Sequence, residues 1–474
     1  MSVEARGVAT LARPERGDVV PLRIGGEERE GGAGALDVID PATTKPAFRV
    51  ALADAQDLDD ALEAAAASDW PRVPAAERGA VLKAGAALLA ERAGDIARGL
   101  MIESGKLLPE AEGELGRAVE TLAWNGEEAG RIGGRLIEGR AAAARREVVS
   151  TPIGVVAAFT AWNFPAVLLA RKLGAALAAG CPVVLKASEE TPWTAAAIVA
   201  TLEDAGLPPG AVDLVFGDPP AVSRHLFASP IVKALTFTGS TAVGTQLAQL
   251  AGLRPAVLEL GGHAPAIVCA DADIDGAIAA LTPAKYGSAG QSCVAPSRFY
   301  IHASRYDEFA AKFAQRSAAT TIGPVIGERR VTAMERFVAD ARARGARVLT
   351  GGERGEGFHF PPTVLADVPD DADVMREEPF GPIAPLTSFT DWEDALARAN
   401  ALPYGLAGYV FTDSQRIAES AVRDLKAGNI GINQMAPSLP DAPLGGLDQS
   451  GLGYEGGSEG VRAFVQMKLI NRTV

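Results

Sequence analysis

Two side chains of the sequence have the types and settings that a covalent nucleophile and its general base need. Cys293 lies among small residues, in Gly287-Ser-Ala-Gly-Gln-Ser-Cys-Val-Ala-Pro296. A turn or helix start there exposes the thiol and can lower its pKa. Glu259 lies in the apolar run Ala256-Val-Leu-Glu-Leu260. Burial of a carboxyl group raises its pKa toward the range useful for a general base.

Both assignments have simpler alternatives. Most cysteines in globular chains are structural, and this interpretation fits Cys181 and Cys269, which lie in apolar strand contexts. His263, in the Gly-rich segment after Glu259, is the other candidate base for Cys293.

Asn163, in Ala161-Trp162-Asn163-Phe164-Pro165, is a neutral donor on an apolar loop. An asparagine in such a loop is often only a turn former. Its functional interpretation is an amide donor for an oxyanion.

A nucleotide site is indicated where Leu235-Thr-Phe-Thr238 runs into Gly239-Ser240-Thr241 and a helix. Ser240 or Thr241 would cap that helix, whose free N–H groups and positive dipole end favour an anion, although an ordinary capped helix is the alternative. Lys186 and Glu189 follow another buried strand, at the end where open α/β sheets bind ligands. They are placed to bind a ribose, or simply to form a surface ion pair.

The elements that must position these residues alternate between strand and helix. Helices are expected at 57–67, 75–89, 96–105 and 110–129, and then at 166–179 and 191–205. Strand-like runs occupy 154–159, 182–185, 212–216 and 231–237. Buried strands that alternate with helices predict a parallel sheet, hence a doubly wound α/β fold.

The pattern restarts near residue 260 and predicts a second α/β unit over about 260–440. Its strands are expected at 256–260, 266–269, 298–301 and 347–349, and its helices at 273–281, 305–318 and 331–345. Two segments fit neither unit: 131–149 reads as an extended hairpin and 462–474 as a terminal strand. Their exposed edges invite pairing with another subunit.

Composition narrows the function classes. The chain has 474 residues, 48% of them hydrophobic and 22% charged, with a formal net charge of −14, which argues against nucleic acid as the main partner. Three cysteines make no disulfide framework, so a cytoplasmic location is expected. The uncharged stretch 148–170 is interrupted by Pro152, Asn163 and Pro165, so we expect no membrane span.

Seven motifs in order make the chain resemble the aldehyde dehydrogenase superfamily over essentially its whole length. They are Trp162-Asn-Phe-Pro165, Lys186-Ala-Ser-Glu189, Phe237-Thr-Gly-Ser-Thr241, Glu259-Leu-Gly-Gly262, Gly290-Gln-Ser-Cys293, Glu377-Glu-Pro-Phe-Gly-Pro382 and Ser450-Gly-Leu-Gly-Tyr-Glu455. The resemblance implies an NAD-binding domain (1–130 and 150–259), a catalytic domain (260–440) and an oligomerisation arm (131–149 and 457–474). A homodimer or homotetramer is then expected.

The resemblance also implies roles. Cys293 would attack the aldehyde, Asn163 and the Cys293 N–H would hold the oxyanion, and Glu259 would activate water against the thioester. Lys172 and Glu455 match positions implicated in a proton relay, although a structural salt bridge would look the same. The implied cofactor residues are Trp162, Lys186, Glu189, Gly239, Ser240, Glu378 and Phe380. No metal site is expected.

Two carboxylates bear on the choice of cofactor and on the fate of the thioester. Glu189 would accept hydrogen bonds from ribose hydroxyls but repel a 2′-phosphate, which predicts NAD rather than NADP. Relatives that transfer the acyl group to coenzyme A typically lack a carboxylate at the position of Glu259, so hydrolysis to a free acid is expected.

Several positions depart from the common family pattern. His263 replaces the usual Lys, and together with Glu455-Gly-Gly-Ser-Glu-Gly460 it resembles the succinate and ketoglutarate semialdehyde dehydrogenase branch. That branch usually places an Arg where this chain has Gly287, which leaves Arg171 as the candidate for a distal substrate carboxylate. Asp448 stands where many relatives have Lys, and the chain is about a dozen residues short near 318–323.

The substrate stays open between a dicarboxylic semialdehyde and a broad range of aliphatic or aromatic aldehydes. Leu169, Trp124 and residues 438–442 are candidate pocket walls. Two other function classes compete: a cysteine-dependent hydrolase without cofactor, and a non-catalytic protein on the same scaffold. Retention of the Cys293, Asn163 and Glu259 set favours the dehydrogenase.

Overall fold

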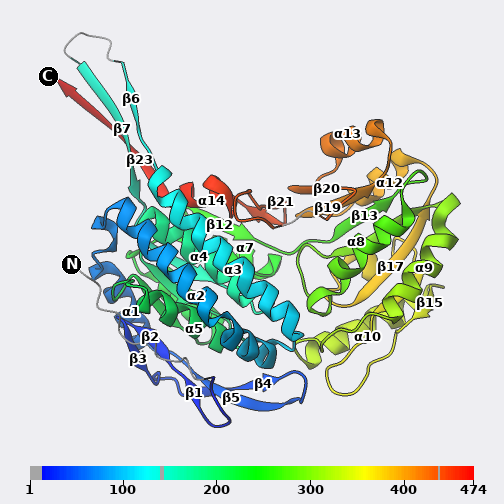
Figure 1. Ribbon diagram of the computed structural model, residues 1–474, viewed down its shortest axis with the longest axis horizontal. Coiled ribbons are helices and arrows are strands. Elements are labelled where there is room, and N and C mark those ends of the chain that lie inside the picture. Colours follow the sequence, from blue (N-terminus) through cyan, green and yellow to red (C-terminus); the bar gives the residue numbers. More distant parts are fainter. Residues whose placement is uncertain (1–12, 139–143, 436–437, 474) are drawn as a thin grey trace.

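The computed structural model describes residues 13–138, 144–435 and 438–473, which form two large sheets and a projecting arm (Figure 1). The first large sheet has eight strands. In spatial order they are β22 (Gly451–Leu452), β12 (Ala256–Glu259), β11 (Val232–Thr238), β8 (Val155–Phe159), β9 (Val183–Lys186), β10 (Val212–Val215), β2 (Leu22–Ile24) and β3 (Glu27–Arg29). The five central strands, from β12 to β10, are parallel, and the edge strands are antiparallel.

Two groups of helices cover this sheet. One comprises α2 (Ala75–Ser104), α3 (Leu108–Glu128), α4 (Pro165–Ala179) and α5 (Pro192–Asp204), and the other α1 (Ala55–Ala67), α6 (Pro219–Ala228) and α7 (Thr241–Ala251). Every residue of β8 and β9 is buried, as a parallel sheet between helices requires. The first α/β unit expected from the sequence is therefore present.

The second large sheet has seven strands, of which six are parallel. They are β15 (Arg347–Thr350), β16 (Thr363–Ala366), β17 (Ile383–Phe389), β14 (Pro296–His302), β13 (Ala264–Val268), β19 (Ala407–Phe411) and β20 (Asn429–Ile432). The accompanying helices are α8 (Ile274–Tyr286), α9 (Tyr306–Ala318), α10 (Glu328–Ala343), α11 (Asp373–Arg376), α12 (Trp392–Ala399) and α13 (Gln415–Asp424). Alternate side chains of β13 enter different cores: Ile267 packs with α10, whereas Ala266 and Val268 pack with α8 and α9. Both faces of this sheet are thus buried, which confirms the α/β class.

A long three-stranded sheet projects from the body, with β7 (Ala144–Pro152) as its central strand and the C-terminal strand along one edge (Figure 1). The other strands are β6 (Arg135–Ile137) and β23 (Val465–Thr473), and β7 is paired to both. The expected terminal strand starts later than predicted, because residues 457–462 form helix α14 (Gly457–Arg462). Val461 and Phe464 there join the main core.

Three further differences from the sequence expectation have simple causes. The two helices expected over 75–105 are one helix, α2, because no proline interrupts it and Leu89, Ile96 and Leu100 continue one buried face. Short strands near the N-terminus were not expected: β2 and β3 extend the first sheet, and β1 (Val19–Val20), β5 (Lys45–Ala51) and β4 (Ala35–Asp40) form a separate one. A two-stranded sheet, β18 (Tyr404–Gly405) with β21 (Leu447–Asp448), was also missed. The strands of two or three residues carry too little periodicity to be recognised, whereas β4 and β5, with six and seven residues, were long enough and were missed.

Candidate functional site

The nucleophile and base predicted from the sequence lie in contact. Glu259 is the last residue of β12, and Cys293 lies in the turn before β14. The Cys293 thiol donates a hydrogen bond to Glu259 Oε1 at 3.2 Å. His263, the alternative base, instead shares a 2.8 Å hydrogen bond between its Nδ1 and Ser297 Oγ. The geometry therefore favours Glu259.

The electrostatics of this pair correct one expectation. Burial, and secondarily the neighbouring Glu455, raises the pKa of Glu259 to about 7, as the sequence suggested. The pKa of the Cys293 thiol, however, is raised well above its usual value, whereas an exposed turn was expected to lower it. The causes are burial and the carboxylates of Glu259 and Glu378, which disfavour a second negative charge.

Two glycines allow the sheets to meet at this pair. Residues 260–263 connect β12 of the first sheet to β13 of the second. A β-carbon at Gly262 would lie 3.0 Å from the Cys293 carbonyl oxygen, and one at Gly261 would lie 2.9 Å from a Glu378 carboxylate oxygen. The two glycines of the Glu-Leu-Gly-Gly motif therefore let the backbone pass close to Cys293 and Glu378.

Asn163 lies beside the segment of residues 288–293 that ends at Cys293, here called the nucleophile turn. It is buried in the loop between β8 and α4, and its side-chain Nδ2 donates to the Gln291 carbonyl at 3.1 Å. Gln291 is itself held, because its Nε2 donates to Ser288 O at 3.1 Å and its Oε1 accepts from Ile326 N at 2.9 Å. One of the two amide hydrogens of Asn163 is thus used to fix it, and the other is available for a ligand.

The turn before Cys293 has an unusual backbone. Ser288 and Ala289 both have φ of 52°, and Gly290 follows at 73°. Left-handed conformations cost residues other than glycine about 1–2 kcal/mol each. Such strain persists only where surrounding contacts hold it, and it concentrates at functional sites.

Lys172 and Glu455 form a buried ion pair. Lys172 lies on α4, and its ammonium group also donates to Thr236 Oγ1 at 3.2 Å. The pair lies near Glu259, since Glu455 raises the pKa of Glu259 and Lys172 lowers it. The salt bridge that the sequence left open is present, and it tunes the candidate base.

The residues predicted for a dinucleotide lie at strand ends of the first sheet. Ser240 caps α7, where its hydroxyl accepts a hydrogen bond from Val243 N at 3.4 Å. The preceding residue is Gly239, and a β-carbon there would clash with the Phe237 ring. Lys186 Nζ and Glu189 Oε2 lie 2.7 Å apart, and Glu189 Oε1 accepts from Gly217 N at 2.8 Å. The predicted ion pair exists, and it leaves both groups at the carboxyl end of β9.

Glu378, Phe380 and Trp162 are the other residues predicted for the dinucleotide. The Trp162 and Phe380 rings contact edge to face, with 5.6 Å between their centres. Burial raises the pKa of Glu378 to about 8, while the Gly262 N–H opposes the shift. A buried carboxylate held beside Gly261 and near Cys293 fits a ribose hydroxyl as hydrogen-bond partner.

Arg171 lies on α4 next to Lys172 and is buried. Its Nη2 donates to Ser438 Oγ at 2.6 Å and to Leu439 O at 3.1 Å. Among the described residues, its Nε and Nη1 have no hydrogen-bond partner. Burial lowers the pKa of this guanidinium, whereas Glu455, Glu259 and Cys293 act in the opposite direction. Its unpartnered N–H groups make Arg171 a candidate for binding an anion.

Sequence reasoning missed three charged residues that contact these loops. Lys106 donates to the Asn163 carbonyl oxygen at 2.6 Å, Glu114 accepts from Ala166 N at 2.8 Å, and Glu110 accepts from Ser288 N at 2.9 Å. The available signal was the capping pattern Leu107-Leu-Pro-Glu110 at a helix start. That pattern places Glu110 at the N-terminus of α3 but cannot show what lies opposite.

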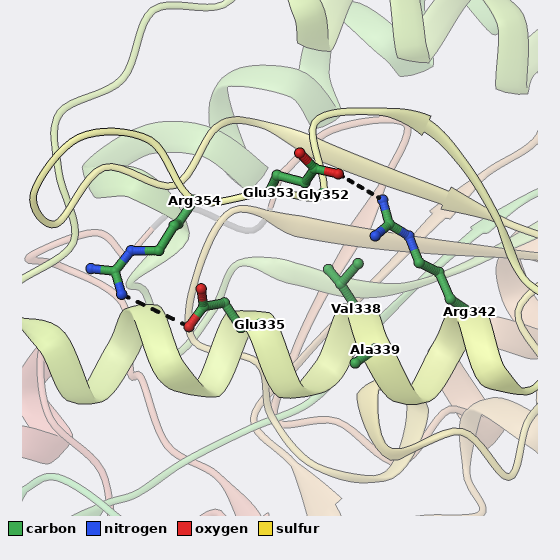
Figure 2. A pocket seen from close by; sticks show the side chains of 7 residues that line it. All are labelled: Glu335, Val338, Ala339, Arg342, Gly352, Glu353 and Arg354. Atoms are coloured by element: carbon green, nitrogen blue, oxygen red, sulfur yellow. Dashed lines mark ion pairs between the residues drawn. The ribbon is translucent and has the colours of Figure 1, made fainter.

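A separate surface pocket of about 350 Å³ contains none of the predicted site residues (Figure 2). It is lined by Glu335, Val338, Ala339 and Arg342 of α10 and by Gly352, Glu353 and Arg354 after β15. Its arginines are ion-paired: Arg342 with Glu353 at 3.8 Å, and Arg354 with Glu335 at 3.9 Å. The pocket therefore reads as an ion-paired surface rather than a binding site.

No helix in the described part of the chain combines the length and apolar character that crossing a membrane requires. Over the same residues, no group of three or more His, Cys, Asp or Glu side chains is arranged to hold a metal ion.

Comparison with known proteins agrees with the geometry. Residues 28–470 match the aldehyde dehydrogenase family. The chain is 46% identical to 4-(hydroxymethyl)benzenesulfonate dehydrogenase TsaD1 of Comamonas testosteroni, over 95% of this chain and 97% of that protein. It is 41% identical to the NADP(+) succinate-semialdehyde dehydrogenase GabD of Escherichia coli, over 92% and 93% of the two chains.

The fold agrees as well. A crystal structure of succinate-semialdehyde dehydrogenase from Burkholderia pseudomallei superposes with a TM-score of 0.93 at 40% identity, covering 96% of this chain and 98% of that one. The resemblance to the semialdehyde branch is thereby confirmed. The chain belongs to the aldehyde dehydrogenase family, whose members oxidise aldehydes with NAD(P).

Proposed function

We propose that the protein oxidises an aldehyde that carries a distal anionic group, a semialdehyde in the simplest case, to the free acid with NAD as hydride acceptor. The observation that carries the reaction is the 3.2 Å contact between the Cys293 thiol and Glu259, with Asn163 beside it. The observation that carries the substrate class is the buried guanidinium of Arg171.

The first step is attack of Cys293 Sγ on the aldehyde carbonyl carbon. Because the pKa of the thiol is raised, the thiol must lose its proton as it attacks, and Glu259, with a pKa of about 7, lies where it can accept it. The free amide hydrogen of Asn163 and the Cys293 N–H would bind the oxygen as it becomes negative.

The side chains predicted for the cofactor have the chemistry that a dinucleotide needs. Ser240 at the N-terminus of α7 would bind a phosphate, Lys186 and Glu189 the adenosine ribose, and Glu378 the nicotinamide ribose, with Phe380 and Trp162 packing beside it. When bound, NAD(P) supplies the hydride acceptor that converts the Cys293 adduct to a thioester.

Hydrolysis completes the reaction. Glu259 has one carboxylate oxygen, Oε2, that is buried and without a partner among the described residues. Once Glu259 has released to solvent the proton that it accepted from Cys293, its carboxylate would take a proton from a water molecule directed at the thioester. Lys172, through its ion pair with Glu455, helps to set the pKa of this base.

A second candidate substrate is an aromatic aldehyde with an anionic substituent. A β-carbon at Gly287 would meet no described atom within 4 Å, so the position where the semialdehyde branch usually places an Arg is open. The relative TsaD1 is named for 4-(hydroxymethyl)benzenesulfonate, which combines a ring with a distal anion. Arg171 would bind a sulfonate as it would a carboxylate.

We also propose a homodimer or homotetramer that uses the arm. Leu136, Met467 and Leu469 are exposed on strands β6 and β23, and β23 is an edge strand. Exposed apolar side chains on an unpaired edge favour pairing with a second copy of the chain.

Replacement Glu259→Gln separates the two half-reactions. We expect a burst of about one NADH per active site that forms more slowly than in wild type, because the amide cannot accept the thiol proton. Later turnover should fall about 10²-fold or more, because the amide cannot activate water. Rapid-mixing absorbance at 340 nm measures both phases. Full steady-state activity in this variant would contradict the assignment of Glu259 as base.

The raised pKa of Glu259 predicts a pH dependence. Because only the ionised carboxylate accepts a proton, the rate of thioester hydrolysis should rise with pH through about 7 and level off above it. The inflection should be absent in Glu259→Gln. An inflection that persists in the variant would assign the titration to another group.

Cofactor choice depends on Glu189. We expect a higher kcat/KM with NAD than with NADP. In Glu189→Gln the preference, which is kcat/KM with NAD divided by kcat/KM with NADP, should fall about tenfold or more, because the amide does not repel a 2′-phosphate. Glu190→Gln, at the next residue, is the matched control, since Glu190 pairs with Arg329 rather than Lys186. A wild-type preference for NADP, the cofactor for which GabD is named, would overturn the assignment of Glu189 as the residue that selects NAD.

Substrate class depends on Arg171. With Arg171→Gln we expect kcat/KM to fall about 10- to 100-fold for succinate semialdehyde and 4-formylbenzenesulfonate, since an ionic hydrogen bond contributes roughly 1.5–3 kcal/mol. Benzaldehyde, which has no distal anion, is the internal control: its kcat/KM should fall much less, since it loses only the effect of Arg171 on the pKa of Glu259. Comparable wild-type kcat/KM for charged and uncharged aldehydes would count against the anionic substrate class.

A further inference from the structure

We propose that residues 105–114, which are the connection between α2 and α3 and the first two turns of α3, form a bracket that sets the separation between Asn163 and Cys293. Three of its side chains, those of Lys106, Glu110 and Glu114, are positioning residues for the oxyanion site. The inference rests on the proposed function, because it concerns the same two reacting loops.

Lys106 holds the Asn163 side of the site. Its ammonium group donates to the Asn163 carbonyl oxygen at 2.6 Å, forms an ion pair with Glu114, and lies 4.1 Å from the centre of the Phe164 ring. The side chains of Lys106 and Glu114 are 3% and 0% exposed. A buried charge pair is costly to keep, and this one fixes the backbone of the residue whose amide faces the reaction.

Glu114 holds the same loop one turn further on. Its Oε1 accepts from Ala166 N at 2.8 Å, in the first turn of α4. Free N–H groups at a helix start need such an acceptor. The chain from Asn163 to Ala166 is therefore held at both ends by one ion pair.

Glu110 holds the Cys293 side. Its Oε1 accepts from Ser288 N at 2.9 Å, within the left-handed turn of Ser288 and Ala289, and its Oε2 accepts from Leu107 N at 3.0 Å. Ser288 belongs to the second sheet's unit, whereas Glu110 belongs to α3 of the first. This contact thus crosses between the units and supports a strained backbone five residues before the nucleophile.

The contacts form a closed circuit. Lys106 binds Asn163, Asn163 donates to Gln291 O, Gln291 donates to Ser288 O, and Ser288 donates to Glu110. Glu110 in turn accepts from Leu107, the neighbour of Lys106. Because every link is a hydrogen bond between buried or partly buried groups, the circuit fixes where the amide of Asn163 lies relative to the nucleophile turn.

The test measures the formation of the oxyanion separately from the reactivity of the thiol. In Glu110→Ala and Lys106→Met we expect the rate of the NADH burst to fall about 10- to 100-fold, as a displacement of about 1 Å in a reacting geometry does. Alkylation of Cys293 by iodoacetamide should stay within about twofold of wild type, because attack at a saturated carbon creates no oxyanion. Glu112→Gln, on the exposed face of the same helix, should change neither rate.

Rescue distinguishes positioning from general damage. Adding Ala289→Gly to Glu110→Ala should restore part of the burst rate, because glycine adopts the left-handed conformation without strain. Lys106→Arg should retain more of the burst rate than Lys106→Met, since it keeps the charge. If Lys106→Met does not fold, the Glu110 variants decide alone.

Three outcomes would overturn the bracket: a wild-type burst rate in folded Glu110→Ala, equal losses of burst and alkylation rates, or no rescue by Ala289→Gly. Failure of the proposed function is seen separately, because wild-type protein would then release no NADH with any aldehyde of the panel.

Discussion

The proposed chemistry depends on one constraint that the structure meets: a thiol carried by one sheet lies within hydrogen-bonding distance of a carboxylate carried by another. Glu259 ends a strand of the eight-stranded sheet, and Cys293 precedes a strand of the seven-stranded sheet. Four residues, 260–263, join the two sheets at this place. A side chain at Gly262 would crowd the Cys293 carbonyl oxygen and Leu406, each 3.0 Å from its β-carbon, so glycine suits the close approach at this link.

Bringing these groups together in a buried place has an electrostatic consequence. Glu259, Glu378 and Glu455 lie close enough to influence one another or the thiol, and burial raises the pKa of the first two. Lys172 and Arg171, both on α4, oppose the shift at Glu259. The result is a carboxyl group that titrates near neutrality and a thiol that stays protonated until it reacts, a division of roles that neither residue type has in water.

The same burial makes support from outside the motifs necessary. The nucleophile turn is left-handed at two residues other than glycine, and the Asn163 loop carries polar backbone groups into a buried region. Lys106, Glu110 and Glu114 satisfy these groups from a single segment, residues 105–114. Buried polar groups need partners, and here the partners are distant in sequence from every residue that does chemistry.

The sequence by itself determined the α/β class and the family, and it predicted the pair Cys293 and Glu259 that the structure places in contact, because strand periodicity and motif residues are local properties. Only the tertiary structure decided that the thiol pKa rises rather than falls, that residues 75–104 form one helix, and that Glu110 reaches Ser288. Each of these depends on which groups distant in sequence come to lie together, and the free energy of a charge or a strained turn is set by those neighbours rather than by the residues adjacent in the chain.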